Sequence, residues 1–144
     1  MHISRSALLP YTAGQLYELI NDVESYPRFL DGCVGAEILR KEEGLMEARL
    51  DLQKKGIKQS FVTRNRLVAP GLIQMELLEG PLKSLHGEWT IRSLADQGCK
   101  LSLDLDFEMK QGLIMQMVAR FFGETANRLV DAICAEAAQR YQPV

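Results

Sequence analysis

Two stretches of the chain alternate strictly between apolar and polar residues, at positions 45–53 and 99–109. A period of two with one polar face predicts a β-strand that has one side in water. Further strands are predicted at residues 3–9, 59–68, 72–79 and 85–94, with turns at Pro70-Gly71 and Gly80-Pro81. Short turns between successive strands predict an antiparallel meander.

A spacing of three to four residues predicts two short helices near the N-terminus. Thr12 and Gln15 form a capping-box pattern in front of the apolar positions Leu16, Leu19, Ile20 and Val23. A second helical turn follows, with Ser25 expected as its cap and Asp31-Gly32 expected to end it.

One long helix is predicted at about residues 112–141. Its apolar residues form two adjacent rows: Leu113, Met117, Phe121, Leu129, Ile133 and Ala137, and Ile114, Val118, Phe122, Ala126, Val130 and Cys134. This stripe is wider than one contact seam requires. Gly123 in mid-helix has two interpretations, close packing on a sheet or room for a ligand.

The order of elements predicts an α+β fold of six to seven antiparallel strands. A half-solvated sheet must cover its apolar face, and the long helix is the only predicted element large enough to do so. We therefore expect one domain over residues 1–144, with the sheet curled around the helix and the two short helices at one end.

Composition narrows the possible functions. A net charge of −2 argues against a protein that coats nucleic acid through overall charge. The start, MHISRSALLPY, lacks the h-region of a signal peptide, so a cytoplasmic location is expected. The three cysteines, Cys33, Cys99 and Cys134, form no metal or disulfide pattern and are expected to be buried.

Several motifs resemble one family. SYPRFL at 25–30 with Cys33, GPLKSLHGEW at 80–89, FVTRN at 61–65 and SRSAL at 4–8 resemble the START-like helix-grip (SRPBCC) family. The similarity is to its coenzyme Q-binding and polyketide cyclase/lipid-transport branch, and most of all to bacterial ribosome association toxins. Leu82 and Asp31-Gly32 depart from the usual motif residues.

The resemblance implies a curved sheet around a helix and two roles. One is binding of ubiquinone or another isoprenoid or lipid, linked to respiration, with no cofactor required. The other is binding of the large ribosomal subunit, which blocks its joining with the small subunit. The cyclase activity of distant relatives is a third, weaker implication.

The residues themselves argue against an enzyme. His2 lies at a terminus expected to be loose, and His86 is expected to face solvent, without a nearby partner for either. No metal-ligand spacing or phosphate-binding loop occurs in the sequence. Asp104, Asp106 and Glu108 alternate with apolar residues, which favours a solvated outer face.

The predicted inner face is either a filled core or the wall of an apolar tunnel of a few hundred cubic ångströms, the lower range for ligand sites. Thr63 and Asn65 share that face with Phe61, so they need a ligand, water or backbone as partner. The expected ligand-binding residues are Phe61, Thr63, Asn65, Met75, Trp89, Leu105, Phe107, Val118, Phe122 and Leu129.

A window between Asp51 and Glu76 contains five basic residues and no acidic one. They are Lys54, Lys55, Lys58, Arg64 and Arg66, expected to gather at a hairpin around Gly56. The window carries +5, so the rest of the chain carries −7. It is either a solvated hairpin or a site for RNA phosphate or anionic lipid. Ligand binding is the leading function predicted from the sequence, and ribosome binding the alternative.

Overall fold

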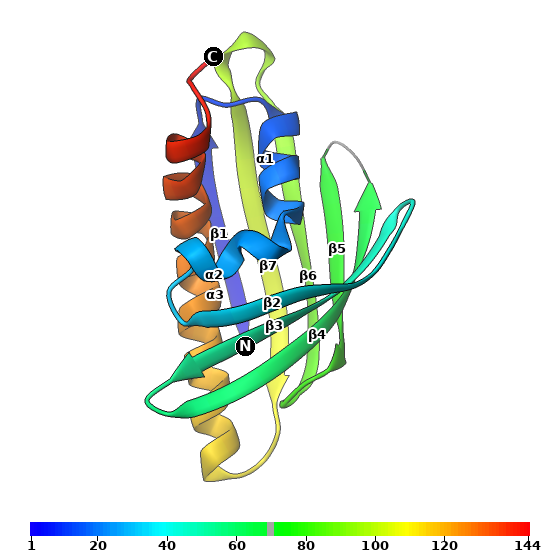
Figure 1. Ribbon diagram of the computed structural model, residues 1–144, viewed down its shortest axis with the longest axis vertical. Helices are drawn as coiled ribbons and strands as arrows, with labels where there is room; N and C mark the ends of the chain where they lie inside the picture. Colours follow the sequence, from blue (N-terminus) through cyan, green and yellow to red (C-terminus); the bar gives the residue numbers. More distant parts are fainter. Residues whose placement is uncertain (69–70) are drawn as a thin grey trace.

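The computed structural model describes residues 1–68 and 71–144, which form one curved antiparallel sheet with a long helix beside it (Figure 1). The sheet has seven strands in the order β1-β7-β6-β5-β4-β3-β2. The strands are β1 (His2–Leu9), β2 (Cys33–Glu42), β3 (Leu45–Lys54), β4 (Ile57–Val68), β5 (Leu72–Glu79), β6 (Leu82–Ser93) and β7 (Cys99–Met109). The helices are α1 (Ala13–Asn21), η1 (Val23–Ser25), α2 (Tyr26–Phe29), η2 (Ala95–Gln97) and α3 (Leu113–Arg140). The predicted α+β helix-grip fold is confirmed.

Among the described strands, β2 is the one that the alternation of apolar and polar residues did not predict. Its pairing with β3 shifts register twice, between Cys33 and Gly35 and between Ile38 and Arg40. Each bulge moves later side chains to the other face, so a regular period of two is lost. β6 also begins at Leu82, before the predicted position 85. The predicted turn at Pro70-Gly71 includes Pro70, which lies outside the described residues.

The two helix caps have different outcomes. The Thr12 hydroxyl accepts a hydrogen bond from the Gln15 amide, and the Gln15 side chain accepts one from the Thr12 amide, so the capping box is confirmed. Ser25 is at the N-cap position of α2 as predicted, but its side chain forms no capping hydrogen bond. Its hydroxyl donates to the Asp22 carboxylate instead. Asp22 also receives a hydrogen bond from Arg140, which ties the exit of α1 to the end of α3.

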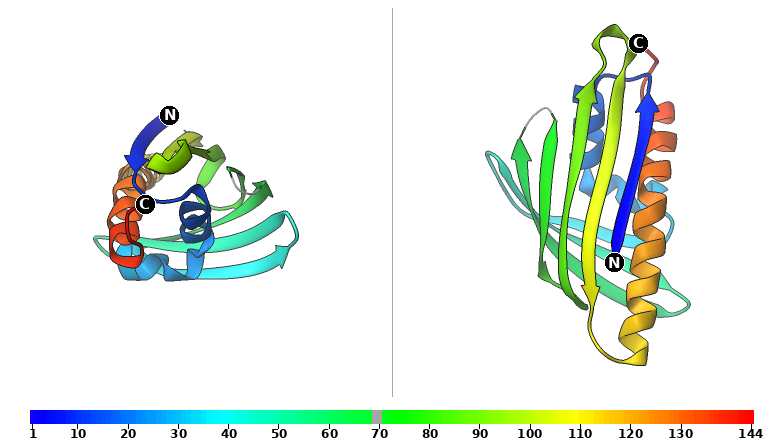
Figure 2. Two further views of the ribbon diagram at one scale, coloured as in Figure 1. Left: turned by 90° about the horizontal axis from the view of Figure 1, so that it is seen from above. Right: turned by 180° about the vertical axis from the view of Figure 1, so that it is seen from behind.

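The core lies between the concave face of the sheet and α3, with α1 and α2 at one end (Figure 2). The inward residues of β7 from Cys99 to Phe107 are buried, and Trp89 on β6 is buried beside them. A Cβ atom added at Gly123 would lie 3.4 Å from Cζ of Phe107. This short distance favours the close-packing interpretation of Gly123.

The apolar stripe of α3 is covered over only part of its length. Val130, Ile133 and Ala137 are buried, whereas Leu113 and Ile114 near the start are 76% and 64% exposed. Met117 is 52% exposed, and Met109, the last residue of β7, is also exposed. The long helix therefore covers the sheet as predicted, but its first turns lie outside that contact. Within the described part of the chain, no helix is long and apolar enough to span a membrane.

Candidate functional site

A cavity of about 100 Å³ lies between the concave face of the sheet and α3. Eight of the ten residues predicted to bind a ligand line it: Phe61, Thr63, Asn65, Met75, Trp89, Leu105, Phe122 and Leu129. Phe107 and Val118 do not. Phe107 packs edge-on against Phe122, and Val118 faces a groove on the surface.

The cavity is smaller than the predicted tunnel of a few hundred cubic ångströms. Aromatic rings fill the space that curvature alone would leave: the centroid of Phe122 lies 4.9 Å from that of Phe61 and 5.0 Å from that of Phe107. One end is lined by residues that the sequence did not assign to the site, among them Val23, Tyr26 and Leu30. The position of Tyr26 in the family-like motif SYPRFL was a signal for it.

Most of the lining is apolar, and its polar groups differ in how they are satisfied. The Tyr26 hydroxyl donates to the Ile20 carbonyl, and burial raises the pKa of Tyr26, which keeps it protonated. The Asn21 amide donates to the Tyr17 carbonyl at 3.1 Å. Oδ1 of Asn65, in contrast, is buried and accepts no hydrogen bond from the described residues. As predicted, Asn65 shares the inner face with Phe61.

The sequence predicted that the five basic residues gather at one hairpin, and this prediction is wrong. Lys54, Lys55 and Lys58 lie at the β3–β4 turn, where Lys55 and Gly56 both have positive φ. Arg64 and Arg66 lie opposite Glu47 and Leu45, at the other end of the same strand pair. The strands are long enough to separate the two groups, which a one-dimensional window does not reveal.

Two of these five charges are compensated. Arg64 forms ion pairs with Glu47 at 3.0 Å and with Glu76 at 3.7 Å. Nζ of Lys54 lies 2.5 Å from the Glu124 carboxylate of α3 and 5.8 Å from the centroid of the Phe121 ring. The hydrogen bond from Lys54 holds the pKa of Glu124 below its ordinary value. Lys55 and Lys58 are exposed and form no ion pair with any residue in the described ranges.

A surface groove of about 270 Å³ runs between this hairpin and the first half of α3. Lys54, Lys55 and Ile57 line one side, and Met117, Phe121 and Arg120 line the other. Exposed apolar residues and free cations therefore share this end of the molecule.

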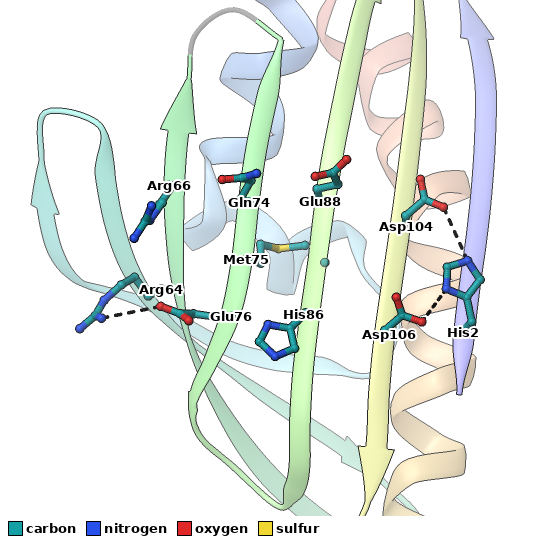
Figure 3. A pocket seen from close by; sticks show the side chains of 11 residues that line it. His2, Arg64, Arg66, Gln74, Met75, Glu76, His86, Glu88, Asp104 and Asp106 are labelled. Carbon is teal, nitrogen blue, oxygen red and sulfur yellow. Dashed lines mark hydrogen bonds and ion pairs between the residues drawn. The ribbon is translucent and has the colours of Figure 1, made fainter.

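The convex face of the sheet carries both histidines (Figure 3). His2 is not loose: it lies on β1, and its ring nitrogens are 2.8 Å from Asp106 and 3.7 Å from Asp104. His86 is exposed, as predicted, between its cross-strand neighbours Glu76 and Asp106. An open groove of about 570 Å³ crosses this face.

The charges on this face form a row across five strands, in the order Arg64, Glu76, His86, Asp106 and His2. Cross-strand pairs of this kind stabilise a sheet by about 0.2–1 kcal/mol each relative to alanine pairs. Asp104, Asp106 and Glu108 point outward as expected from the alternation. Among the described residues, no group of three His, Cys, Asp or Glu could hold a metal ion.

The cysteines offer no reactive thiolate. Cys33 and Cys99 are buried, whereas Cys134 is only half-buried, contrary to expectation. Burial raises the pKa of all three thiols, so they are protonated and poor nucleophiles near neutral pH.

Comparison with known proteins places these features in context. Residues 9–134 match the family described as polyketide cyclase / dehydrase and lipid transport. The ribosome association toxin RatA of Pseudomonas aeruginosa is 44% identical over 140 residues, which are 97% of both chains. RatA of Escherichia coli is 44% identical over 96% of this chain and 88% of its own. A more distant relative, the mitochondrial coenzyme Q-binding protein COQ10 homolog B of Xenopus laevis, is 23% identical over 96% of this chain and 58% of its own.

Solved structures share the fold. The Zhui aromatase/cyclase of Streptomyces sp. R1128 superposes with a TM-score of 0.85 at 20% identity, over 99% of this chain and 96% of its own. A START superfamily protein of Mycobacterium smegmatis superposes with a TM-score of 0.80 at 24% identity, over 97% of this chain and 99% of its own. At such low identity these likenesses show the fold alone.

Proposed function

The chain belongs to the polyketide cyclase / dehydrase and lipid transport family, and we propose that it is a cytoplasmic ribosome-associating protein without enzymatic activity. The observation that carries this proposal is the 44% identity to a ribosome association toxin over 97% of both chains. The sequence alone had favoured ligand binding. The comparisons reverse that order, because the coenzyme Q-binding relative is only 23% identical.

The partner we propose is the large ribosomal subunit, bound through ribosomal RNA so that the small subunit cannot join. The β3–β4 hairpin supports this choice, because the cations of Lys55 and Lys58 are exposed at its tip. Exposed lysines that neutralise RNA phosphates release counterions, which gives affinity to a protein whose net charge of −2 would otherwise oppose binding. The hairpin carries no aromatic residue between positions 53 and 60, so it would contact phosphate rather than bases.

Co-sedimentation with large subunits at several salt concentrations tests the proposal. The variant is Lys55→Glu with Lys58→Glu, which reverses two free cations and leaves the Lys54–Glu124 pair intact. The matched control is Lys41→Glu with Arg92→Glu, which changes the net charge equally at two exposed sites away from the hairpin. Each lost phosphate contact lowers the slope of log K against log salt by about 0.7–0.9.

We expect the hairpin variant to bind at least roughly tenfold more weakly and with a slope reduced by about 1.5, and the control to bind like the wild type. If the wild-type protein stays in the supernatant at low salt, ribosome association is wrong. If both variants weaken equally, net charge rather than the hairpin governs binding.

A second candidate function is binding of an apolar ligand such as a quinone, another isoprenoid or a lipid. The internal cavity favours it, because eight of the ten predicted residues line one apolar space. At about 100 Å³ that space is below the roughly 300–1,000 Å³ usual for ligand sites, so a ligand of quinone size requires side chains or helices to move. Native mass spectrometry of protein from its own host tests this candidate, and purification without a bound lipid or quinone would count against it.

No cofactor is needed for either role. The residues that line the cavity include no His, Cys, Asp, Glu or Lys in the part of the chain that the structure describes. Tyr26 is a general-acid type of residue in this lining, but its hydroxyl already donates to the Ile20 carbonyl and burial raises its pKa, which argues against cyclase or dehydrase chemistry. This is why we place an enzymatic role third.

A further inference from the structure

The amide of Asn65 is the most unusual polar group in the interior. The residue is only 7% exposed, and its Oδ1 accepts no hydrogen bond from residues 1–68 and 71–144. Native proteins leave few buried side-chain acceptors unpaired, because each one loses the hydrogen bonds that water would supply. An acceptor held in this state at the wall of a cavity indicates that its partner comes from outside the chain.

The neighbours of Asn65 explain why the protein does not satisfy it. Asn65 is paired across the sheet with Met46 on β3 and with Met75 on β5. A thioether sulfur has no hydrogen to donate, so neither flanking side chain can bond to Oδ1. Phe61 lies four residues earlier on the same face of β4, and its ring has no group that donates a hydrogen bond to Oδ1. The site therefore combines apolar walls with one acceptor.

We propose that this cavity binds a single-ring alcohol of the phenol type, whose hydroxyl donates a hydrogen bond to Oδ1 of Asn65. The inference rests on the second candidate function and names the ligand class and its anchor. The rings of Phe61, Phe122 and Trp89 supply the contact surface for the ligand ring. Specificity comes from the unpaired acceptor, because a ligand without a donor leaves Oδ1 unsatisfied.

The size of the cavity supports a small ligand. Its volume of about 100 Å³ exceeds the roughly 30 Å³ share of one water and approaches the roughly 150 Å³ of an apolar cavity that binds benzene. Movement of the flexible Met75 side chain supplies the remaining space for one ring. Polycyclic molecules and long isoprenoid chains do not fit without a larger rearrangement of α3 or the N-terminal helices.

The experiment compares three probes of similar size. Phenol can donate a hydrogen bond, cyclohexanone can only accept one, and toluene can neither donate nor accept. Binding is followed through the methyl NMR signals of Met46 and Met75, which flank Asn65. We expect the dissociation constant of phenol to be about 3- to 10-fold lower than that of toluene, the effect of one hydrogen bond. Cyclohexanone should bind no better than toluene.

Two variants locate the anchor. Asn65→Leu keeps the side-chain volume and removes the acceptor, so the variant should bind phenol and toluene with about equal affinity. Thr63→Val tests the other polar side chain of this strand and cavity wall as an alternative anchor. Thr90→Val, at an exposed position of β6 outside the cavity lining, is the control that should keep the preference of the wild type. If Thr63→Val and not Asn65→Leu removes the preference, the anchor is misassigned and the proposal is wrong.

The wild-type measurements decide the proposal even if a variant does not fold. Equal affinity for phenol and toluene would overturn the hydroxyl preference but leave ligand binding in the cavity standing. Tighter binding of cyclohexanone would show that the amide presents its Nδ2 group instead, which also overturns the proposal. If no probe shifts either methyl signal, this inference is wrong, while native mass spectrometry still decides separately whether a larger apolar ligand binds. Ribosome association is unaffected by any of these outcomes.

Discussion

The start of α3, at residues 113–117, and the rest of the helix have the same apolar periodicity in opposite surroundings. In the C-terminal half, Val130, Ile133 and Ala137 are fully buried. At the N-terminal end of α3, Leu113, Ile114 and Met117 are more than half exposed. In Figure 1 the first turns of α3 extend past the ends of the neighbouring strands, while the later turns lie along β1. The difference is one of coverage, not of helix chemistry.

The exposed start of α3 also lies next to the basic hairpin. The hairpin reaches α3 through the Lys54–Glu124 ion pair, and a groove separates the two elements. A soluble protein rarely leaves several large apolar side chains together in water without a use for them. The buried residues from Val118 onward therefore hold α3 on the fold, whereas the first turns leave apolar side chains exposed.

The largest expected effect lies in the buried region. Trp89 on β6 is among the largest fully buried side chains of the protein. Trp89→Ala should lower the free energy of unfolding by about 3–5 kcal/mol, because it removes a large aromatic group and leaves a cavity. Urea denaturation followed by circular dichroism measures this change. A loss below about 1 kcal/mol would mean that the core around Trp89 is not tightly packed.

A matched pair of isoleucines tests the comparison directly. Ile133→Ala should cost about 2–5 kcal/mol of folding free energy, since Ile133 is 0% exposed. Ile114→Ala, the same change on the same helix, should cost no more than about 0.5 kcal/mol. Thermal unfolding of both variants measures the difference. Equal costs would show that the start of α3 is covered in solution, contrary to the structure.

The exposed start of α3 should matter for partner binding rather than for folding stability. Leu113→Ala combined with Met117→Ala should weaken ribosome association about fivefold, since some but not all interface side chains contribute to affinity. Its folding stability should stay close to that of the wild type, and co-sedimentation next to the Ile114→Ala variant measures the effect. Unchanged binding of the double variant would restrict the contact to the hairpin.

The smallest effect concerns the ion pair that joins the two elements. Lys54 lowers the pKa of Glu124, so Lys54→Met should raise that pKa towards its ordinary value of 4.5. The depressed carboxylate stabilises the folded state above pH 4.5, and this contribution is lost as the pH falls through the lower folded-state pKa. An NMR titration of the Glu124 carboxylate measures the change. An identical pKa in both proteins would show that the pair is not formed in solution.

Much of the candidate site followed from alternation along single strands. The register of β4 placed Phe61, Thr63 and Asn65 on one face and Arg64 on the other, and the structure agrees. Two errors about the basic residues had the same cause, because closeness along the sequence was taken for closeness in space. The sequence window counted Lys54 and Arg64 together although the strand separates them, and it could not pair Lys54 with Glu124, which lies 70 positions away.

The sequence by itself determined the long helix and the strands other than β2, with their inward faces, because periods of two and of three to four residues are local properties of the backbone. The family followed from motifs such as SYPRFL at 25–30. Only the tertiary structure decided that the first turns of the α3 stripe are uncovered, since that depends on where the sheet ends relative to the helix. The size of the cavity was also a tertiary result, because it is set by how Phe61, Phe107 and Phe122 interlock from three different elements. The same applies to the unpaired Asn65, whose isolation arises from methionines on two neighbouring strands.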